Sequence, residues 1–466
     1  MPEALGCAGG PARSSGDVSV MGAERRGRVV RGCIRSTNRR SHGGIRVDRL
    51  KSPGKPFVIS KQAVWEAWEK VKANRGAPGV DGVAIEAFEK DLQGNLYKIW
   101  NRMSSGSYFP PPVRAVEIPK PHGSGTRILG VPTVGDRIAQ TVVAGVVESR
   151  AEPMFHPDSY GYRPKRGALD AVAACRERCW RYDWVIDLDI RAFFDSVPWD
   201  LVVKALGAVC DVPWVLLYVE RWLKAPLAWA DGRVQQRGRG TPQGSAVSPV
   251  LANLFLHFAF DAWMARGFPG VVFERYVDDA VVHCVSLGEA QRVLAALRER
   301  MGEVGLALHP EKTRIVYCKD SNRTGSFEYT AFTFLGYTFQ PRGARRKDGK
   351  MFTGFNPAVS NDALKRIGVT VRSWRLHKCT LMTEADLARW INPVVRGWMN
   401  YYGAFYRSAL YPLLARINAY LVRWLRKKYK RLRARGKAHE AWTRAVALRP
   451  RFFAHWQWVN WVPAVW

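Results

Sequence analysis

The first regular pattern of apolar positions begins near Ser60. Val64, Trp68 and Val71 recur at helical spacing in KQAVWEAWEKVKANR, so we predict an amphipathic helix with Ser60 at its start. The segment RGAPGVDG at 75–82 then ends it with glycine and proline. Residues 1–55 are rich in Arg, Gly and Ser and show little apolar period, which predicts a flexible basic arm.

Between about 85 and 340, helical stretches alternate with short β-forming runs. The clearest runs lie at 113–119, 184–190, 271–285 and 332–339. This alternation predicts an α+β fold with hairpins and an antiparallel sheet, unlike a doubly wound parallel sheet. A Gly/Arg/Lys-rich stretch at 342–350 is interpreted as a connector, and beyond about 355 the chain reads as helical and basic.

Composition then narrows the class of protein. In 466 residues the hydrophobic share is 47% and the aromatic share 12%, enough for a large core and for several modules. The formal net charge of +32 favours a polyanionic partner, because cations that neutralise phosphates release counterions. Nucleic acid is the leading partner; a generically basic surface or a membrane surface are the alternatives.

Several other classes of protein are not supported by the sequence. The sequence has no apolar run of about 18 residues and no secretory leader pattern. Its eight cysteines show no zinc-site spacing, and Cys175 and Cys179 are interpreted as two half-buried thiols, which fits a reducing compartment. The basic arm would also suit an organellar transit peptide or an upstream start, with Met21 as a candidate true start.

Four acids stand where a structural protein would avoid them. Asp187 and Asp189 share one face of the apolar run WVIDLDI, and Asp278 and Asp279 interrupt a second run at the expected tip of a hairpin. A shared divalent cation resolves the cost of such acids, and oxygen ligands favour Mg²⁺ over Zn²⁺. Two such ions would serve phosphoryl or nucleotidyl transfer. Turn formation and capping are the alternative roles.

Two further segments suggest ligand contacts. Gly240, Pro242 and Gly244 predict an irregular loop around Gln243, followed by a helix with Ser248 as its N-cap and proline at its first position. The stretch 118–140 sets Lys120 and Arg127 beside a Gly-rich turn that can fold over a triphosphate, with Arg137 a weaker candidate. A plain loop-to-helix junction and a solvated turn are the alternatives.

The C-terminal part carries the densest positive charge. From Arg416 to Lys437 there are ten Lys or Arg residues and no acid. On a helical wheel one face is basic and the opposite face apolar, which predicts a helix that packs on one side and contacts phosphates on the other. A solvated charged face is the alternative. The basic positions are Arg416, Arg423, Lys427 and Lys430, and the apolar ones are Leu414, Ile417, Leu421 and Leu425.

Three motifs resemble those of reverse transcriptases. YVDD at 276–279 resembles their Y-x-D-D box, DIRAFFD at 189–195 their first catalytic strand, and 239–261 their PQG box with its helix. The resemblance implies that Asp189, Asp278 and Asp279 bind the metal ions. It also implies that Phe194 lies under the incoming sugar, where its ring would exclude a 2′-hydroxyl and favour dNTPs.

The resemblance covers roughly 57–340, including NRGAPGVDG at 74–82, typical of non-long-terminal-repeat enzymes. Lys120, Arg127 and Gln243 are then expected at the dNTP. LHPEKT at 308–313 implies that Lys312 lies at the same site and helps to hold the acids. Gly336, read within an aromatic strand, suggests close approach of a backbone, such as that of the primer.

The segment INPVVRGWMNYYGAFY at 391–406 resembles the maturase-specific region of group II intron proteins. We expect most of its aromatic residues (Trp398, Tyr401, Tyr402 and Tyr406) in the core, with stacking on unpaired bases as the alternative. Those enzymes often end in an HNH endonuclease. Nothing after Lys437 resembles one, so DNA cleavage is not predicted.

Together these features predict a right-hand polymerase of α+β class followed by an all-α basic thumb. The expected parts are an arm at 1–55, fingers at 56–180, a palm at 181–341, a linker at 342–355 and a helical thumb or maturase domain at 356–466.

The expected activity is RNA-directed DNA synthesis with two Mg²⁺ ions, together with help to intron splicing and mobility. Expected partners are group II intron RNA, an RNA template, a DNA primer or target and dNTPs, with no membrane and no prediction of oligomeric state. A bacterial-type cytoplasmic ribonucleoprotein is the expected setting, with an organelle as the alternative. A splicing-only maturase and a retron, CRISPR-associated or diversity-generating reverse transcriptase are the other readings; an RNA-dependent RNA polymerase is disfavoured by Phe194.

Overall fold

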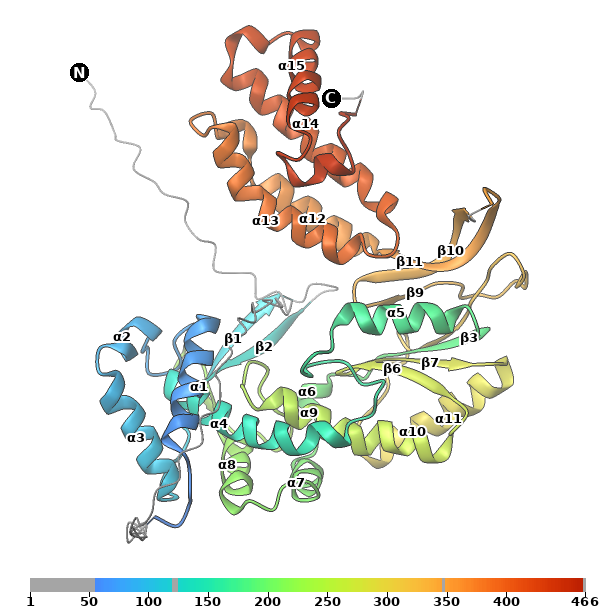
Figure 1. Ribbon diagram of the computed structural model, residues 1–466. Coiled ribbons are helices and arrows are strands. Elements are labelled where there is room, and N and C mark those ends of the chain that lie inside the picture. The colour runs from blue at the N-terminus through green and yellow to red at the C-terminus, as the bar shows by residue number, and fades with distance from the viewer. Residues whose placement is uncertain (1–54, 120–124, 346–347, 464–466) are drawn as a thin grey trace, which may run out of the picture. The chain divides into compact units, whose positions relative to one another are not determined.

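The computed structural model describes residues 55–119, 125–345 and 348–463 (Figure 1). The predicted basic arm, apart from Lys55, and the candidate Lys120 lie outside these described residues.

The first described helix follows the sequence pattern. Helix α1 (Lys61–Asn74) begins after Ser60, whose hydroxyl accepts a hydrogen bond from the backbone N–H of Gln62. Its apolar positions are buried, with Val64 1% and Trp68 2% exposed, so this prediction is confirmed. The helices that follow in this region are α2 (Ile85–Glu89), α3 (Leu92–Ser104) and α4 (Val134–Ala151), with the short turn η1 (Glu152–Met154).

A four-stranded sheet in the order β2-β1-β4-β5 lies beside these helices. It is built from β1 (Val113–Pro119), β2 (Thr126–Val131), β4 (Leu227–Ala228) and β5 (Val234–Gln235). Strand β4 runs parallel to β1, with Val113 opposite Leu227. The segment 227–235 therefore joins the sheet of β1 and β2 across the boundary predicted at 180/181 between fingers and palm.

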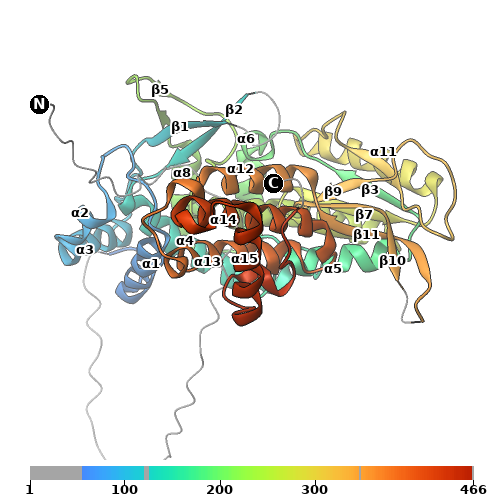
Figure 2. The ribbon, with the colours of Figure 1, turned by 90° about the horizontal axis from the view of Figure 1, so that it is seen from above.

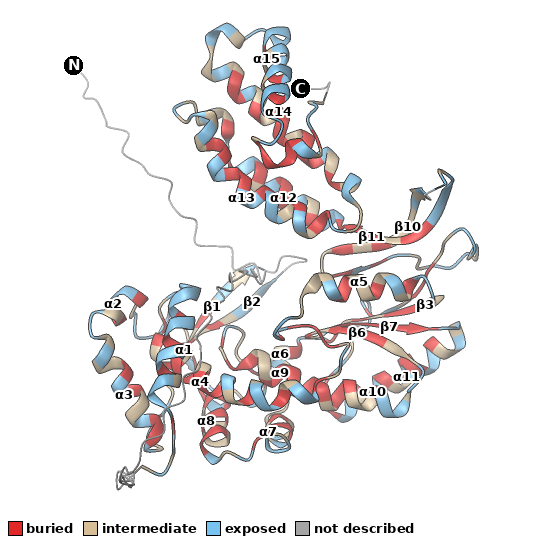
Figure 3. Cartoon of the chain, in the orientation of Figure 1, coloured by how far each residue is buried: buried red, intermediate tan, exposed pale blue. Residues whose placement is uncertain are grey.

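The central sheet has the order β6-β7-β3-β8 and is antiparallel throughout. Helix α5 (Ala168–Cys179) covers one face, while α10 (Ala262–Gly267) and α11 (Leu287–Glu303) lie on the other (Figure 1). Buried positions follow its strands (Figure 3). The strands are β3 (Trp184–Leu188), β6 (Val272–Tyr276), β7 (Asp279–Cys284) and β8 (Arg314–Tyr317); the helices between them are α6 (Phe193–Ser196), α7 (Trp199–Gly207), α8 (Pro213–Lys224), α9 (Ser248–Leu256) and the π-helical turn η2 (His257–Asp261).

The predicted linker at 342–355 lies within a β-hairpin. Strands β9 (Phe332–Phe334), β10 (Tyr337–Arg345) and β11 (Met351–Val359) form a third sheet in the order β11-β10-β9. The nine-residue pairing of β10 with β11 brings Arg345 opposite Met351. Long antiparallel pairing satisfies the backbone groups that a free connector would leave to water.

From Asn361 onward the described chain is helical, as predicted (Figure 2). Buried side chains from this region (Ile391 and Ile417) share one apolar cluster with Val185 and Val316 of the central sheet. The α+β class, with antiparallel sheets and a helical C-terminal region, is thus confirmed. The elements are α12 (Asn361–Ser373), η3 (Leu376–Lys378), α13 (Glu384–Tyr402), η4 (Arg407–Leu410), α14 (Tyr411–Lys428), η5 (Lys430–Leu432), α15 (Arg435–Leu448) and η6 (Ala454–Gln457).

The aromatic residues of the 391–406 segment pack within the protein. Tyr402 is 5% exposed, the ring of Trp398 stacks on Trp374, and the hydroxyl of Tyr406 donates to the carbonyl of Gly343. Tyr402 thus has the expected core position, while Trp398, Tyr401 and Tyr406 are half-buried. Among the described residues, no helix is both long and apolar enough to cross a bilayer.

Candidate active site

Asp189 directly follows strand β3, at the end of the central sheet where β7 begins. The strand ends at Leu188, which pairs with Ala280 of β7, so Asp189 emerges beside the start of β7. Its backbone is fixed from the other side, because its carbonyl accepts a 2.8 Å hydrogen bond from His309 N–H and its N–H lies 3.3 Å from Thr313 Oγ1. Hydrogen bonds to its backbone therefore fix the position of Asp189, which is distant in sequence from Asp278 and Asp279.

The other two acids lie at a two-residue hairpin turn. Tyr276 pairs with Asp279, which leaves Val277 and Asp278 as the turn between β6 and β7, as the sequence predicted. Val277 has a φ of +61°. A β-branched residue in the left-handed region is strained by about 1–3 kcal/mol, and such strain persists only where the surroundings hold it.

The four acids perturb one another. Desolvation, followed by repulsion from Asp189, raises the pKa of Asp187 to about 7. Desolvation also raises the pKa of Asp278, and for Asp279 repulsion from the other three carboxylates adds to it. Repulsion between neighbouring carboxylates disfavours their ionisation, and a bound cation relieves this repulsion. A donor set made only of carboxylate oxygens suits a hard divalent ion. Asp187 and Asp189 thus lie close to the turn that carries Asp278 and Asp279.

One lysine lies within this group. Lys312 Nζ is 3.5 Å from Asp189 Oδ2, with 62% of the lysine side chain exposed. This position fits the expected role of Lys312 in holding the acids better than it fits the expected contact with dNTP. An exposed pair of this kind is screened by water and contributes little to stability.

The PQG loop lies against Phe194 and the fingers. Thr241 N–H donates to the carbonyl of Phe194 at 2.7 Å, and Gly130 N–H donates to the carbonyl of Gln243 at 2.7 Å. Phe194 and Gln243 line the same cavity of about 300 Å³, whose wall runs along 235–243. Two predicted substrate residues therefore line one hollow.

Glycine is required at two points of this loop. Gly240 has a φ of +81°, and an added Cβ would lie 2.8 Å from the carbonyl oxygen of Phe194. Gly244 has a φ of +108°, and its Cβ would lie 2.5 Å from the carbonyl oxygen of Gly130. The backbone approaches that were expected toward a ligand are, at these two positions, approaches within the protein.

Ser248 does not act as the expected N-cap. It is the first residue of α9, and its hydroxyl donates to the carbonyl of Pro242 at 3.0 Å. This bond closes the loop on itself instead of satisfying a helix N–H.

A buried polar group that sequence reasoning missed anchors the same loop. The side-chain oxygen of Gln140 accepts from Ser245 Oγ and from Ala246 N–H, both at 2.8 Å. Its amide nitrogen donates to Asp136, which is 1% exposed and also accepts from Trp222. Burial raises the pKa of Asp136 to about 6. Asp136 and Gln140 are polar residues on the buried face of α4, and this pattern was the sequence signal that could have predicted the anchor.

In the fingers, Arg127 lies on β2 with its Nε buried and without a hydrogen-bond partner among the described residues. Tyr162, which the sequence did not single out, is close enough for both Arg127 and Asp278 to influence its pKa, which burial raises. Tyr162 also has a φ of +53°. Arg137 faces another way, because its guanidinium donates to the carbonyl of Ala77 and braces the loop before α2.

Gly336 has a structural explanation within the fold. Phe334 pairs with Tyr337, so Leu335 and Gly336 form a hairpin turn in which both φ angles are positive, at +50° and +79°. A Cβ on Gly336 would lie 3.3 Å from the ring of Tyr402. The stretch read as one strand is therefore a tight hairpin packed on α13.

The basic surface of the C-terminal helical region follows α14. Leu414, Ile417, Leu421 and Leu425 are all buried, while Arg423 and Lys427 are exposed and Arg416 is partly buried. The predicted helix does not continue to Lys437: α14 ends at Lys428, and Lys430 begins the separate turn η5. Lys430 therefore does not share the face of α14.

A hollow of about 300 Å³ beside α14 extends this surface. It is lined by Arg423 and Tyr420 of α14 and by cations from the end of α12 and from η3. Desolvation and then the charges of Lys427, Arg423 and their neighbours lower the pKa of His377 in this hollow. A histidine so placed indicates a strongly positive local field. The remaining cations are Arg372, Arg375 and Lys378.

The cysteines expected to be half-buried, Cys175 and Cys179, are fully buried residues of α5. Ligand atoms of Cys175, Glu274 and His283 lie within 4.8 Å of one another. Glu274 already binds Arg178 at 2.6 Å and His283 at 2.7 Å, and this carboxylate raises the pKa of His283 to about 10 against the effect of its burial. With two positive partners in place, the group is balanced without a metal ion.

Comparison with known proteins agrees with this geometry. Residues 118–339 match the family model "Reverse transcriptase (RNA-dependent DNA polymerase)", and 364–442 match "Group II intron, maturase-specific domain". The chain is 31% identical to Protein YkfC of Escherichia coli over 339 residues, 63% of this chain and 83% of that protein. It is 27% identical to the Group II intron-encoded protein LtrA of Lactococcus lactis over 201 residues, 43% of this chain and 33% of LtrA.

A telomerase structure from Candida albicans, in complex with a fragment of telomeric RNA, is similar with a TM-score of 0.44 and 11% identity, covering 80% of this chain and 67% of that one.

The acid-bearing antiparallel sheet and the family match define a reverse transcriptase. The chain belongs to the group II intron-encoded reverse transcriptases, RNA-directed DNA polymerases that depend on a divalent metal ion and carry an RNA-binding maturase-specific domain.

Proposed function

We propose that this chain extends a DNA primer on an RNA template with dNTPs, and that Asp189, Asp278 and Asp279 hold two Mg²⁺ ions for the transfer. The observation that supports the proposal is the pairing of β3, which ends one residue before Asp189, with β7, which begins at Asp279 after the turn. The bound ions would activate the primer 3′-hydroxyl and stabilise the leaving pyrophosphate. The chain's own part is to fix the three carboxylates in place.

Substrate selection is assigned to the hollow along 235–243. Phe194 and Gln243 line it, and the ring of Phe194 would meet a ribose 2′-hydroxyl. Arg127, whose Nε has no partner within the described chain, is assigned to the triphosphate, because a guanidinium forks onto phosphate oxygens. Lys120 keeps its expected role at the same phosphates.

The thumb is assigned to RNA, with group II intron RNA as the specific partner and splicing assistance as the second activity. Arg423 and Lys427 stand exposed on a helix whose opposite face is buried, and the adjoining hollow adds further cations. Arg416 and Lys430 flank this surface. A cytoplasmic ribonucleoprotein is the proposed setting, with an organelle as the alternative.

The assignment of domains is part of the proposal. We assign the fingers to 56–180 together with 227–235, the palm to the rest of 181–341, and the thumb to the helices from Asn361 onward. The hairpin of β10 and β11 connects palm and thumb.

The test is primer extension by the purified chain on an RNA template with dNTPs and Mg²⁺, wild type against Asp278→Ala. Extension should be lost in Asp278→Ala while RNA affinity stays within about twofold, because no phosphate contact is removed. Equal loss of extension and RNA affinity would contradict the assignment. Wild-type RNA binding and intron splicing without any extension would instead indicate a splicing-only maturase.

A further inference from the structure

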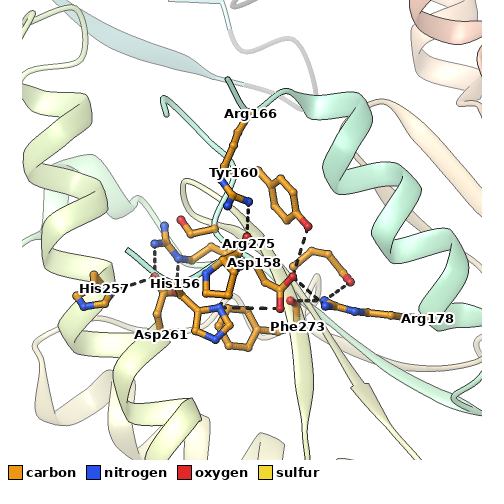
Figure 4. Close-up of polar contacts among 12 residues, drawn as sticks. His156, Asp158, Tyr160, Arg166, Arg178, His257, Asp261, Phe273 and Arg275 are labelled. Carbon is orange, nitrogen blue, oxygen red and sulfur yellow. Dashed lines mark hydrogen bonds and ion pairs between the residues drawn. The ribbon is translucent and has the colours of Figure 1, made fainter. Parts of the chain in front are cut away.

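Strand β6 carries two adjacent buried charges just before the catalytic turn. Glu274 is 0% and Arg275 is 1% exposed. Glu274 faces α5, whose Arg178 binds it, and it also binds His283 of the neighbouring strand β7. Arg275 faces the opposite side, where its Nε and Nη2 bind the two carboxylate oxygens of Asp261 at 2.7 and 2.6 Å (Figure 4). Two buried ion pairs thus flank one strand, on opposite faces.

Only one of these pairs reaches the turn. Arg275 Nη1 donates to the carbonyl of Val277 at 2.9 Å and to Asn253 Oδ1 at 3.1 Å. Arg178 instead binds Glu274, the carbonyl of Phe273 and Asp158, all of which lie outside the turn. The guanidinium of Arg275 is therefore the side-chain group that ties the peptide before Asp278 to the core.

The turn is enclosed from a second direction by the segment around Gly161. Asn253 Nδ2 donates to the carbonyl of Gly161 at 2.6 Å, and a Cβ on Gly161 would lie 2.7 Å from the backbone nitrogen of Val277. The neighbouring stretch pairs with β6, since Tyr160 N–H donates to the carbonyl of Arg275. Arg275, Asn253 and Gly161 together restrict a turn whose valine has a positive φ.

The partner of Arg275 comes from an unusual helical turn. Asp261 is the last residue of the π-helical turn η2 and is fully buried. One extra residue per turn rotates the following side chains around the helix axis, and such turns are frequent at functional sites. Asp261 fixes two of the three nitrogens of the guanidinium, which leaves Nη1 aimed at Val277.

We propose that Arg275 is a positioning residue of the polymerase site, which holds the Val277 carbonyl so that Asp278 faces the metal ions. The inference rests on the proposed function of the acids. An arginine is needed, because its planar fork serves Asp261 and Val277 at once, whereas an ammonium group is a single point of charge. Arg275 touches neither substrate nor metal in this account.

The experiment compares Arg275→Lys with Arg178→Lys, the same change on the two faces of one strand. Single-nucleotide addition to a DNA primer on RNA is measured at equal concentrations of folded protein, with thermal melting alongside. Arg275→Lys should lower kcat by roughly tenfold or more and raise the Mg²⁺ concentration for half-maximal activity, with dNTP KM and RNA affinity within about threefold. Arg178→Lys should lower the melting temperature but leave kcat within about threefold of wild type.

If Arg275→Lys does not fold, Asn253→Ala is tested in its place, because it keeps the Arg275–Asp261 pair. This variant should lower kcat by several-fold, since it loosens the same turn. Wild-type kcat and Mg²⁺ dependence in Arg275→Lys, or an equal fall in Arg178→Lys, would overturn the inference. An inactive wild-type protein would count against the proposed function instead.

Discussion

Lys312 Nζ lies 3.5 Å from Asp189 Oδ2, so an ammonium group stands where the proposed metal ions would gather. The lysine comes from the segment before β8, whose Thr313 also contacts the backbone of Asp189. One short segment thus fixes the backbone of the acid and partly neutralises its side chain.

Replacing Lys312 should strengthen metal binding in the free protein. In Lys312→Met the competing charge is gone, so Mg²⁺ should raise the melting temperature more than in wild type, while metal-free stability changes by less than about 1 kcal/mol because the pair is exposed. Thermal melting with and without Mg²⁺ measures this. Lys224→Met, which removes an exposed lysine paired with Glu220, is the control and should match wild type. A smaller Mg²⁺ shift in Lys312→Met would contradict the competition.

The ring of Phe194 should decide the choice of sugar. Phe194→Val shortens the wall of the hollow that Gln243 also lines, so it should raise incorporation of NTPs relative to dNTPs by about tenfold or more. Steady-state kcat/KM for matched dNTP and NTP on one RNA template gives the ratio. An unchanged ratio would place the sugar elsewhere.

Acid should destabilise the thumb through His455. This side chain is fully buried, its Nε2 lies 2.6 Å from Asn418 Oδ1, and burial lowers its pKa to about 3. The unfolded state therefore takes up the proton first, and stability falls as pH drops from about 6.5 toward 3, by up to about 1.4 kcal/mol per unit.

Urea unfolding between pH 7 and 5 measures this slope. His455→Asn should flatten it by one proton, whatever its effect on absolute stability. An equal slope in both proteins would show that His455 is not the group responsible.

RNA affinity should depend on salt through the thumb. Arg423→Gln combined with Lys427→Gln removes two exposed cations from α14, so the slope of log affinity against log salt should fall by about one to two. The matched control removes Arg292 and Arg298, which are exposed on α11 behind the central sheet, and should leave the slope unchanged. Equal effects of both pairs would indicate non-specific attraction to the whole basic surface.

Local pattern and short motifs were enough to predict several elements. The spacing of Val64, Trp68 and Val71 gave α1, and two β-forming runs around Asp278 gave the hairpin with its turn. Each of these depends on neighbours within a few residues. The helical class of the C-terminal region followed in the same way.

Features that depend on residues far apart in the sequence were not predicted. The β1–β4 pairing joins residues more than a hundred positions apart, and the Arg275–Asp261 pair depends on the π-helical turn. Gly336 was misread because a two-residue turn inside FTFLGYTF carries no polar turn signal apart from the glycine. The end of α14 at Lys428 was missed because the basic composition continues beyond it.

The most direct test of the convergent acids is single-turnover nucleotide addition by Asp189→Asn, on RNA template with DNA primer and Mg²⁺. Of the three proposed ligands, Asp189 is the one outside the YVDD turn, and Asp183→Asn on the segment leading into β3 provides the matched control. We predict that Asp189→Asn slows the step by roughly a thousandfold with RNA affinity retained, and that Asp183→Asn does not. Near-wild-type addition by Asp189→Asn would show that β3 supplies no metal ligand and would contradict the account.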